Sequence, residues 1–278
     1  ITATGLGTQL PEWGYFIDGK LEELDAEGEW YYDANAKKVY FYPKGGVDPN
    51  TLLIEGVTYD TGISISNQEN NATIENLSFR HFTGKGVSLN SSDNLLVRNC
   101  HFEYNVVGIA LWNSANTQVT GNTFNNHLKD SIGLSAQSTF NVQQTVIANN
   151  TITNTGMYPA YGVRSNGVYQ GLGISVFGKA YTVRQNTIDW SSHSGMYLKD
   201  GGHHLIENNV VSHSLALLND GGAIAISSDG NTIRGNFLLE SIGNVDESNG
   251  CASLNTTPCN HHPSYGMGIG ADNNFKDN

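Results

Sequence analysis

Three acidic residues in the second half of the chain stand where carboxyl groups could act on a ligand. Asp220 is followed by two glycines and an alternating apolar run, Asp272 follows a later glycine-rich run, and Glu240 begins a long polar insertion. Glycines beside a carboxylate let a ligand approach the backbone closely. Two carboxyl groups that flank a glycosidic bond can cleave it, and their separation decides between retention and inversion. We predict Asp220 as the first catalytic carboxylate, with Asp272 or Glu240 as its partner; an Asx turn is the structural alternative for Asp220.

A second polar cluster, Lys199-Asp-Gly-Gly-His-His204, lies at the end of a short apolar run. Lys199 could bind a carboxylate or sulfate of a ligand, or act as a base. A solvated lysine at a strand end is the structural alternative. His213 occupies the same place as Glu240 one repeat earlier, so we predict that His213 and Lys199 contact the substrate.

A repeat that runs from Thr73 to Asn236 must position these residues. It reads apolar, two variable residues, a ladder residue that is usually asparagine, one variable residue, apolar. The ladder residues are 23, 22, 28, 36, 23 and 27 residues apart, and a period of 22 to 23 with insertions is typical of solenoid coils. The seven copies are Ile74-Leu77-Phe79, Val97-Cys100-Phe102, Val119-Asn122-Phe124, Ile147-Asn150-Ile152, Val183-Asn186-Ile188, Ile206-Asn209-Val211 and Ile233-Asn236-Leu238.

Each repeat also contains a second short strand in which apolar residues alternate with small or polar ones. Such alternation places one side of the strand in a core. Stacked coils bury a continuous core, and stacked asparagines can hydrogen-bond along the stack. The sequence therefore predicts an all-β, right-handed parallel β-helix of about eight coils. The strands begin at Gly62, Gly86, Gly108, Gly133, Gly173, Gly195, Ala223 and Gly266.

Four insertions fall at one turn of this repeat, at residues 127–132, 155–172, 214–222 and 241–265. Insertions at one turn stack along one edge of a solenoid, and long loops in compact repeats are usually functional. We therefore predict a groove on the outward face of the glycine strands. Its two columns would be Ser88, Ala110, Ser135, Ser175, Tyr197, Ala225 and Asn90, Trp112, Gln137, Phe177, Lys199, Ser227.

Three aromatic residues stand on this predicted floor of small residues. Trp112, Phe177 and Tyr197 could stack against the apolar faces of sugar rings, and we predict them as substrate-binding residues. The alternative is that the inserted loops cover them as a small satellite core.

Composition excludes several classes of partner. With 14 basic and 26 acidic residues the net charge is −12, and the absence of a basic stripe argues against nucleic acid. The charge also disfavours a polyanionic ligand, unless calcium or a local basic patch offsets the repulsion. No apolar run approaches the length of a membrane span.

The three cysteines have different expected roles. Cys100 takes a ladder position and is predicted to be a buried free thiol. Cys251 and Cys259 could form a disulfide, which implies an oxidising compartment. Two unpaired thiols, or a metal site with His261 and His262, are the alternatives that the spacing leaves open.

The first 60 residues lack the repeat and are predicted to form a separate capping segment. Alternating aromatic strands at 28–33 and 39–43 flank a turn, which indicates a β-hairpin. Its aromatic residues could cover the first coil or stack against carbohydrate. Residues 61–278 form the predicted solenoid. Because they end within a coil, we expect a longer parent protein, or a further domain or chain that covers the last coil.

The motifs Glu-Trp-Tyr-Tyr-Asp and Val-Tyr-Phe-Tyr-Pro, the repeat Val-Thr-Gly-Asn-Thr-Phe and the segment Asn-Asp-Gly-Gly-Ala-Ile together resemble bacterial β-helical glycoside hydrolases of the xylosidase and fucosidase type. The resemblance implies a secreted or cell-surface bacterial enzyme that acts on a plant or algal polysaccharide or oligosaccharide. It places Asp220 in the active-site region and a second acidic residue after a later glycine strand, here Asp272. In the relatives an aromatic and an acidic pair stand there, and this chain departs from that pattern with Gly270-Ala-Asp-Asn273. No organic cofactor is implied, and a structural or catalytic Ca²⁺ ion is left open.

Two other functions remain open at this point. A polysaccharide lyase or epimerase that acts on uronate polymers would use Lys199 and a calcium site. A non-catalytic adhesin or scaffold would use the solenoid as a binding surface.

Overall fold

The computed structural model describes residues 19–135, 144–158, 170–218, 221–241, 243 and 266–271. Asp220 and Asp272, the cysteines Cys251 and Cys259, and Gln137 lie outside these ranges. The described residues fall into two compact units that divide after Gly56, and each is considered by itself. No helix in the described ranges is long and apolar enough to cross a membrane.

The N-terminal unit contains the predicted β-hairpin. Trp30 pairs with Phe41 and Asp33 with Lys38 in an antiparallel ladder, and Asp33 Oδ1 accepts the N–H groups of Asn35 and Ala36 in the turn. The elements of this unit are η1 (Leu21–Glu23), β1 (Trp30–Asp33), β2 (Lys38–Phe41), η2 (Lys44–Gly46) and η3 (Pro49–Thr51).

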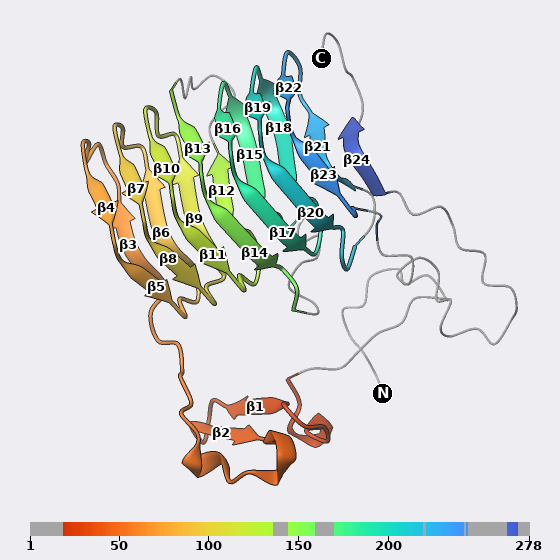
Figure 1. Cartoon of the computed structure of the whole chain (residues 1–278). Coiled ribbons are helices and arrows are strands. Elements are labelled where there is room, and N and C mark those ends of the chain that lie inside the picture. The colour runs from red at the N-terminus through yellow and green to blue at the C-terminus, as the bar shows by residue number, and fades with distance from the viewer. Residues whose placement is uncertain are drawn as a thin grey trace, which may run out of the picture. The chain divides into compact units, whose positions relative to one another are not determined.

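The second unit is a parallel β-solenoid with three sheets, and each coil contributes one strand to each sheet (Figure 1). The two strands around the ladder residue form two seven-stranded sheets, and the glycine strand forms an eight-stranded one. The described residues thus form about seven complete turns, against the eight predicted, with one further strand in the third sheet, and the predicted fold class is confirmed.

The first seven-stranded sheet consists of β4 (Thr73–Glu75), β7 (Leu96–Arg98), β10 (Gln118–Thr120), β13 (Val146–Ala148), β16 (Thr182–Arg184), β19 (Leu205–Glu207) and β22 (Thr232–Arg234). The second consists of β5 (Ser78–Arg80), β8 (His101–Glu103), β11 (Thr123–Asn125), β14 (Thr151–Thr155), β17 (Thr187–Ser191), β20 (Val210–Ser214) and β23 (Phe237–Leu239). The eight-stranded sheet consists of β3 (Thr61–Ile65), β6 (Lys85–Asn90), β9 (Val107–Trp112), β12 (Ile132–Ser135), β15 (Ile174–Lys179), β18 (Met196–Gly202), β21 (Gly221–Ser227) and β24 (Gly266–Ala271).

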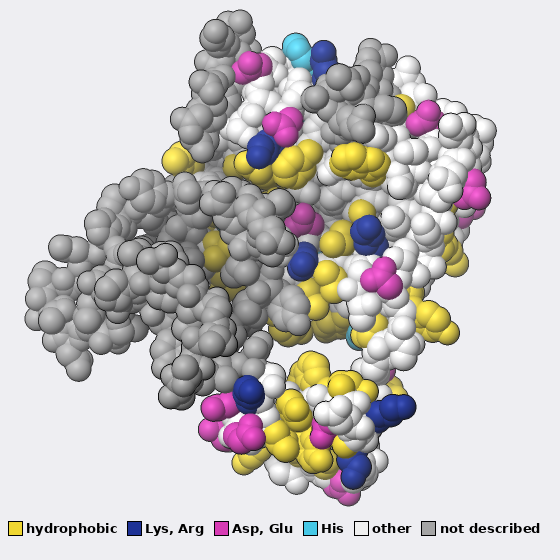
Figure 2. Space-filling model, turned by 180° about the vertical axis from the view of Figure 1, so that it is seen from behind, with side chains coloured by type: hydrophobic (Ala, Val, Ile, Leu, Met, Phe, Trp, Pro, Cys, Tyr) yellow, Lys and Arg dark blue, Asp and Glu magenta, His cyan; other side chains and the backbone are white. Residues whose placement is uncertain are grey.

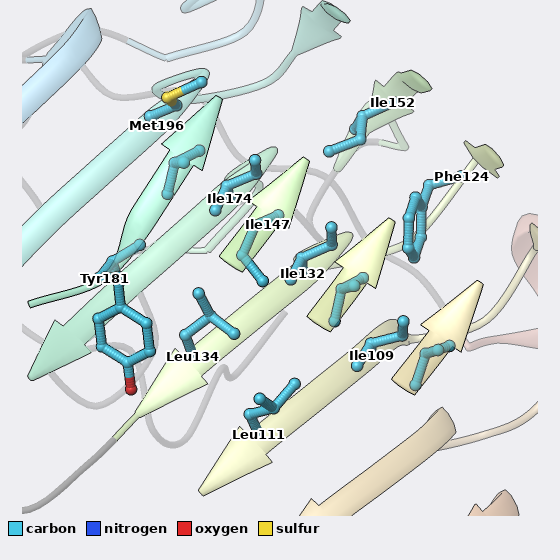
Figure 3. Packing of buried hydrophobic residues seen from close by; sticks show 14 of the residues in the cluster. Ile109, Leu111, Phe124, Ile132, Leu134, Ile147, Ile152, Ile174, Tyr181 and Met196 are labelled. Carbon is cyan, nitrogen blue, oxygen red and sulfur yellow. The ribbon is translucent and has the colours of Figure 1, made fainter. Parts of the chain in front are cut away.

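The core is built from one or two inward side chains on each strand. Ile109, Ile132 and Ile174 lie in one row on neighbouring strands of the eight-stranded sheet, all fully buried (Figure 3). Each predicted apolar position of the repeat meets its counterpart on the next coil, as Val119 pairs with Val97 and Ile147. The solenoid therefore buries a continuous apolar column that no single coil could bury alone.

The asparagine ladder is present and complete on one side of the core. Asn150 Oδ1 accepts both the backbone N–H and the Nδ2–H of Asn122, at 3.0 Å each, and Asn150 Nδ2 donates to Asn186 Oδ1 and to the carbonyl of Val119. The residue before each ladder position is left-handed, for example Asn149 with φ 56° and Gly121 with φ 68°. Asparagine and glycine tolerate this region best, which explains the frequent pairs of such residues in the repeat. Cys100 is a buried free thiol, as predicted.

The structure corrects the predicted register of one coil by two residues. Gly133 pairs with Ala110 and Ser175, and Ser135 pairs with Trp112 and Phe177, so Ser135 belongs to the column in which Gln137 was predicted. The physical reason is that this register buries both Ile132 and Leu134 completely. A slip of two residues keeps the same side chains inward, so alternation alone could not detect it. The predicted register of the last strand is also corrected by two residues, because Ile269 pairs with Ile224 and Gly268, rather than Gly266, stands opposite Ala223.

Candidate functional site

A pocket of about 560 Å³ lies on the outward face of the eight-stranded sheet. Its floor consists of small residues that follow one column across four coils, Ser88, Ala110, Gly133 and Ser175. A Cβ atom added at Gly133 would meet nothing closer than 3.6 Å, so the floor is open above this residue. The remaining lining residues are Lys85, Leu89, Asn90, Val107, Leu111, Trp112, Asp130, Ser135 and Phe177. On the face shown in Figure 2, hydrophobic side chains lie among a few basic and acidic ones.

Asp130 brings a carboxyl group into this pocket. It belongs to the first of the four insertions and stands two residues before β12. Its Oδ1 accepts the N–H of Leu172 at 3.1 Å and its Oδ2 accepts the hydroxyl of Ser175 at 3.2 Å. Burial raises the pKa of Asp130 from 3.8 to about 6, despite these hydrogen bonds and the positive charge of Lys129, which favour the charged form. The carboxyl group is thus partly protonated near neutral pH.

Aromatic side chains stand along one side of the same floor. Trp112 ends β9 and is 44% exposed, and Phe177 lies two strands further on in the same column. The ring of Tyr197 meets that of Phe177 edge to face, with centroids 6.0 Å apart. The structure therefore brings all three predicted aromatic residues to one face and places Trp112 and Phe177 in the pocket wall.

Two lysines flank this aromatic and carboxylate cluster. Lys85 begins β6 and lines the pocket together with Val107, its partner on the next strand, and with Asp130. Lys199 is exposed and pairs in register with Phe177, as predicted for the groove floor. Among the described lining residues, Lys85 and Asp130 are the ionisable ones. The pocket is therefore neutral to positive in a chain whose net charge is −12.

His213 and Glu240 form a separate cluster at the carboxyl ends of strands in the second seven-stranded sheet, His213 within β20 and Glu240 directly after β23. His213 Nδ1 lies 2.6 Å from Asp189 Oδ1, and its Nε2 lies 2.9 Å from Glu240 Oε2. The imidazole stacks on Trp190 with ring centroids 4.5 Å apart and an interplanar angle of 2°. The predicted neighbourhood of His213 and Glu240 is present, but neither residue lines the pocket.

The sequence-predicted carboxylates Asp220 and Asp272 lie outside the described residues, so their catalytic roles stay predictions. Sequence reasoning missed Asp130 and Lys85. A signal for Asp130 existed, because residues 127–132 were already recognised as an insertion bordering the groove. The described residues contain no group of three or more His, Cys, Asp or Glu side chains that could hold a metal ion. The alternative metal site at Cys251, Cys259, His261 and His262 falls outside the described ranges.

Stacked three-stranded coils of this kind define a parallel β-helix. The model of the family described as "right handed beta helix region" matches residues 47–169 and 172–276, and the chain belongs to this family. No curated protein matches the chain. Among solved structures, the chain is similar to the crystal structure of alginate lyase from Paenibacillus sp. str. FPU-7, with 14% identity over 65% of this chain and 67% of that one and a TM-score of 0.45. So low a TM-score carries no argument about activity.

Proposed function

We propose that this protein is a carbohydrate-active enzyme that cleaves a polysaccharide bound on the outward face of the eight-stranded sheet. The observation that carries the proposal is the carboxyl group of Asp130 on the floor of an aromatic-walled pocket, with its pKa raised to about 6. A carboxyl group that stays partly protonated near neutral pH can donate a proton to the oxygen of a scissile glycosidic bond. The open floor above Gly133 leaves room for a sugar beside it.

Hydrolysis is the first route that this geometry supports. It requires a second carboxylate about 5–9.5 Å from the proton donor, as nucleophile or as base for a water molecule. Asp220 directly precedes β21, which lies three strands from β12. Three strand spacings amount to roughly 14 Å between β12 and β21. The second carboxylate of a hydrolase stays a prediction, with Asp220 and Asp272 as the candidates from the sequence.

β-Elimination on a uronate polymer is the second route, favoured by Lys85 in the same pocket as Asp130. A cation beside the sugar carboxylate stabilises the charge that develops when a base removes the proton on the adjacent ring carbon. The bond from the neighbouring ring carbon to the glycosidic oxygen then breaks, a carbon–carbon double bond forms, and Asp130 protonates the leaving oxygen. Lys199 remains the predicted base for this route.

The test is a panel of neutral and acidic plant and algal polysaccharides incubated with the wild type and with Asp130→Asn, Asp220→Asn and Lys85→Gln. Both routes create new reducing ends, but only elimination creates the ultraviolet absorbance of an unsaturated sugar. We expect Asp130→Asn to lose about 10²–10⁴-fold in kcat/KM, the range of general acid catalysis, with little change in melting temperature. Because the protonated carboxyl is the active form, wild-type kcat/KM should fall as the pH rises through about 6.

The outcomes separate the alternatives. Full activity in Asp130→Asn together with its loss in Asp220→Asn would refute the role of Asp130 and favour the predicted site before β21. A loss of activity that follows a loss of folded protein would give Asp130 a structural role through Leu172 and Ser175. No product from any polysaccharide would favour the non-catalytic scaffold.

A further inference from the structure

The outermost column of the eight-stranded sheet contains a gap between two aromatic residues. Strand pairing places Asn90, Trp112, Ser135, Phe177 and Lys199 in successive positions of this column. Ser135 thus stands directly between Trp112 and Phe177, and all three line the pocket. One rung of the column has a small side chain where its neighbours on both sides carry rings.

The width of this gap follows from the aromatic stack inside the same solenoid. The rings of Phe79, Phe102 and Phe124 occupy successive coils, with centroids 4.9 and 4.8 Å apart and interplanar angles of 11° and 5°. Two coil spacings in this stack therefore amount to about 9.7 Å, and Trp112 and Phe177 are likewise two coils apart. A single six-membered ring placed midway would lie nearly 5 Å from each, within the range of about 4.5–7 Å at which ring pairs make contact.

We propose that Trp112 and Phe177 hold one pyranose ring between them above Ser135. The C–H faces of a pyranose are apolar and suit the faces of aromatic rings, while the hydroxyl groups at its edge point to solvent or to Ser135. Phe177 is supported by its edge-to-face contact with Tyr197, and Trp112 is 44% exposed and so accessible to a ligand. We call these three residues, Trp112, Ser135 and Phe177, the ring clamp.

The ring clamp lies next to the proposed proton donor. The carboxyl group of Asp130 accepts the hydroxyl of Ser175 at 3.2 Å, and Ser175 stands two residues before Phe177, roughly 7 Å along β15. The clamped ring is therefore a sugar at the scissile bond or its immediate neighbour in the chain. The clamp as a binding site does not depend on cleavage; only its role beside the scissile bond rests on the proposed function.

The experiment fills the gap and compares it with the same ring placed outside it. Ser135→Phe inserts an aromatic side chain between Trp112 and Phe177. The control is Ser66→Phe. Ser66 follows Ile65, which pairs with Leu89, so it stands in the same column one strand before Asn90, and it does not line the pocket. Both substitutions are made in the Asp130→Asn background, so that the ligand persists. Binding is measured by isothermal titration calorimetry with linear tetrasaccharides of β-1,4-xylose, β-1,4-glucose, β-1,4-mannuronate and α-1,4-galacturonate.

We expect at least one tetrasaccharide to bind, with Ser135→Phe weakening its binding more than tenfold and Ser66→Phe changing it less than about twofold. Trp112→Ala and Phe177→Ala should each weaken it about three- to tenfold, the size of one ring contact. These two variants keep the proposal testable if Ser135→Phe lowers the melting temperature. Equal weakening by Ser135→Phe and Ser66→Phe, or no binding to any of the four ligands, would overturn the clamp. Binding that shows the expected pattern in a protein without cleaving activity would leave the clamp standing and refute the proposed function.

Discussion

Removing one rung of the asparagine ladder tests the coil register on which the site depends. Asn150 is the best choice because it lies in the middle of the ladder and is only 1% exposed. Its side chain makes four hydrogen bonds of 2.9–3.0 Å, two to Asn122, one to the carbonyl of Val119 and one to Asn186. Asn150→Ala removes all four and leaves the backbone of Asn150 in place.

The expected loss of stability follows from these contacts. A net contribution of about 1 kcal/mol for each hydrogen bond gives about 4 kcal/mol. The backbone N–H of Asn122 and the carbonyl of Val119 are left buried without this partner, which keeps the loss near this value even if the neighbours relax. In a domain of this size, such a loss lowers the melting temperature by roughly 8–16 °C.

The assay is urea unfolding followed by circular dichroism, with Thr151→Ala as the matched control. Thr151 is the next residue, is exposed, and belongs to the same coil. We expect the control to change the free energy of unfolding by less than about 0.5 kcal/mol, as is usual for surface substitutions. If Asn150→Ala lowered the free energy of unfolding no more than Thr151→Ala, the ladder would not hold the coils in register. The residues assigned to the pocket from this register would then no longer be established as neighbours.

Two further predictions concern histidines with opposite pKa shifts. Burial lowers the pKa of His127 from 6.5 to about 4, so protonation of His127 favours the unfolded chain. The free energy of unfolding should therefore fall by up to roughly 3 kcal/mol as the pH drops from 6.5 to 4. Urea unfolding at pH 7 and 4.5 should show a smaller fall for His127→Gln than for the wild type. The pKa of His213 is raised, first by its hydrogen bond to Asp189 and then by Glu240, so the stability it contributes is complete below pH 6.5 and is lost as the pH rises through the raised pKa. Nuclear magnetic resonance titration should place the pKa of His213 above 6.5 and show a larger drop for Asp189→Asn than for Glu240→Gln; an equal drop would contradict the leading role of Asp189.

Sequence patterns were sufficient to predict the fold because every coil needs the same residue types at the same positions. The repeat has seven apolar positions such as Val119, and an asparagine or its substitute follows three residues after each one. These copies can be aligned without any knowledge of the structure. Glycine at the start of the third strand has a steric cause. A Cβ atom at Gly86 would come within 2.8 Å of the carbonyl oxygen of Gly108 and of the ring of Phe102. Strong local constraints of this kind survive in the sequence as a visible period.

The pocket was harder to predict because its parts do not repeat. Asp130 occurs once, and burial raises its pKa against the opposing effect of its hydrogen bonds to Leu172 and Ser175, which are more than 40 residues away in the chain. The register of β12 could not be read from alternation, since Ile132 and Leu134 both satisfy the inward pattern. The aromatic residues were found because they interrupt a floor of small side chains, which is visible in the sequence.

The spacing of the coils has different consequences inside the solenoid and on the outward face of the eight-stranded sheet. Inside, each coil must supply a side chain that fills the stack, because an empty rung beside Phe102 would be a cavity that costs several kcal/mol. Outside, a small side chain such as Ser135 removes nothing from the apolar core, so the outward columns are free to vary. An irregular outward column on a regular core can therefore acquire ring-sized gaps without loss of stability, and Ser135 between Trp112 and Phe177 has the dimensions that the inner stack dictates.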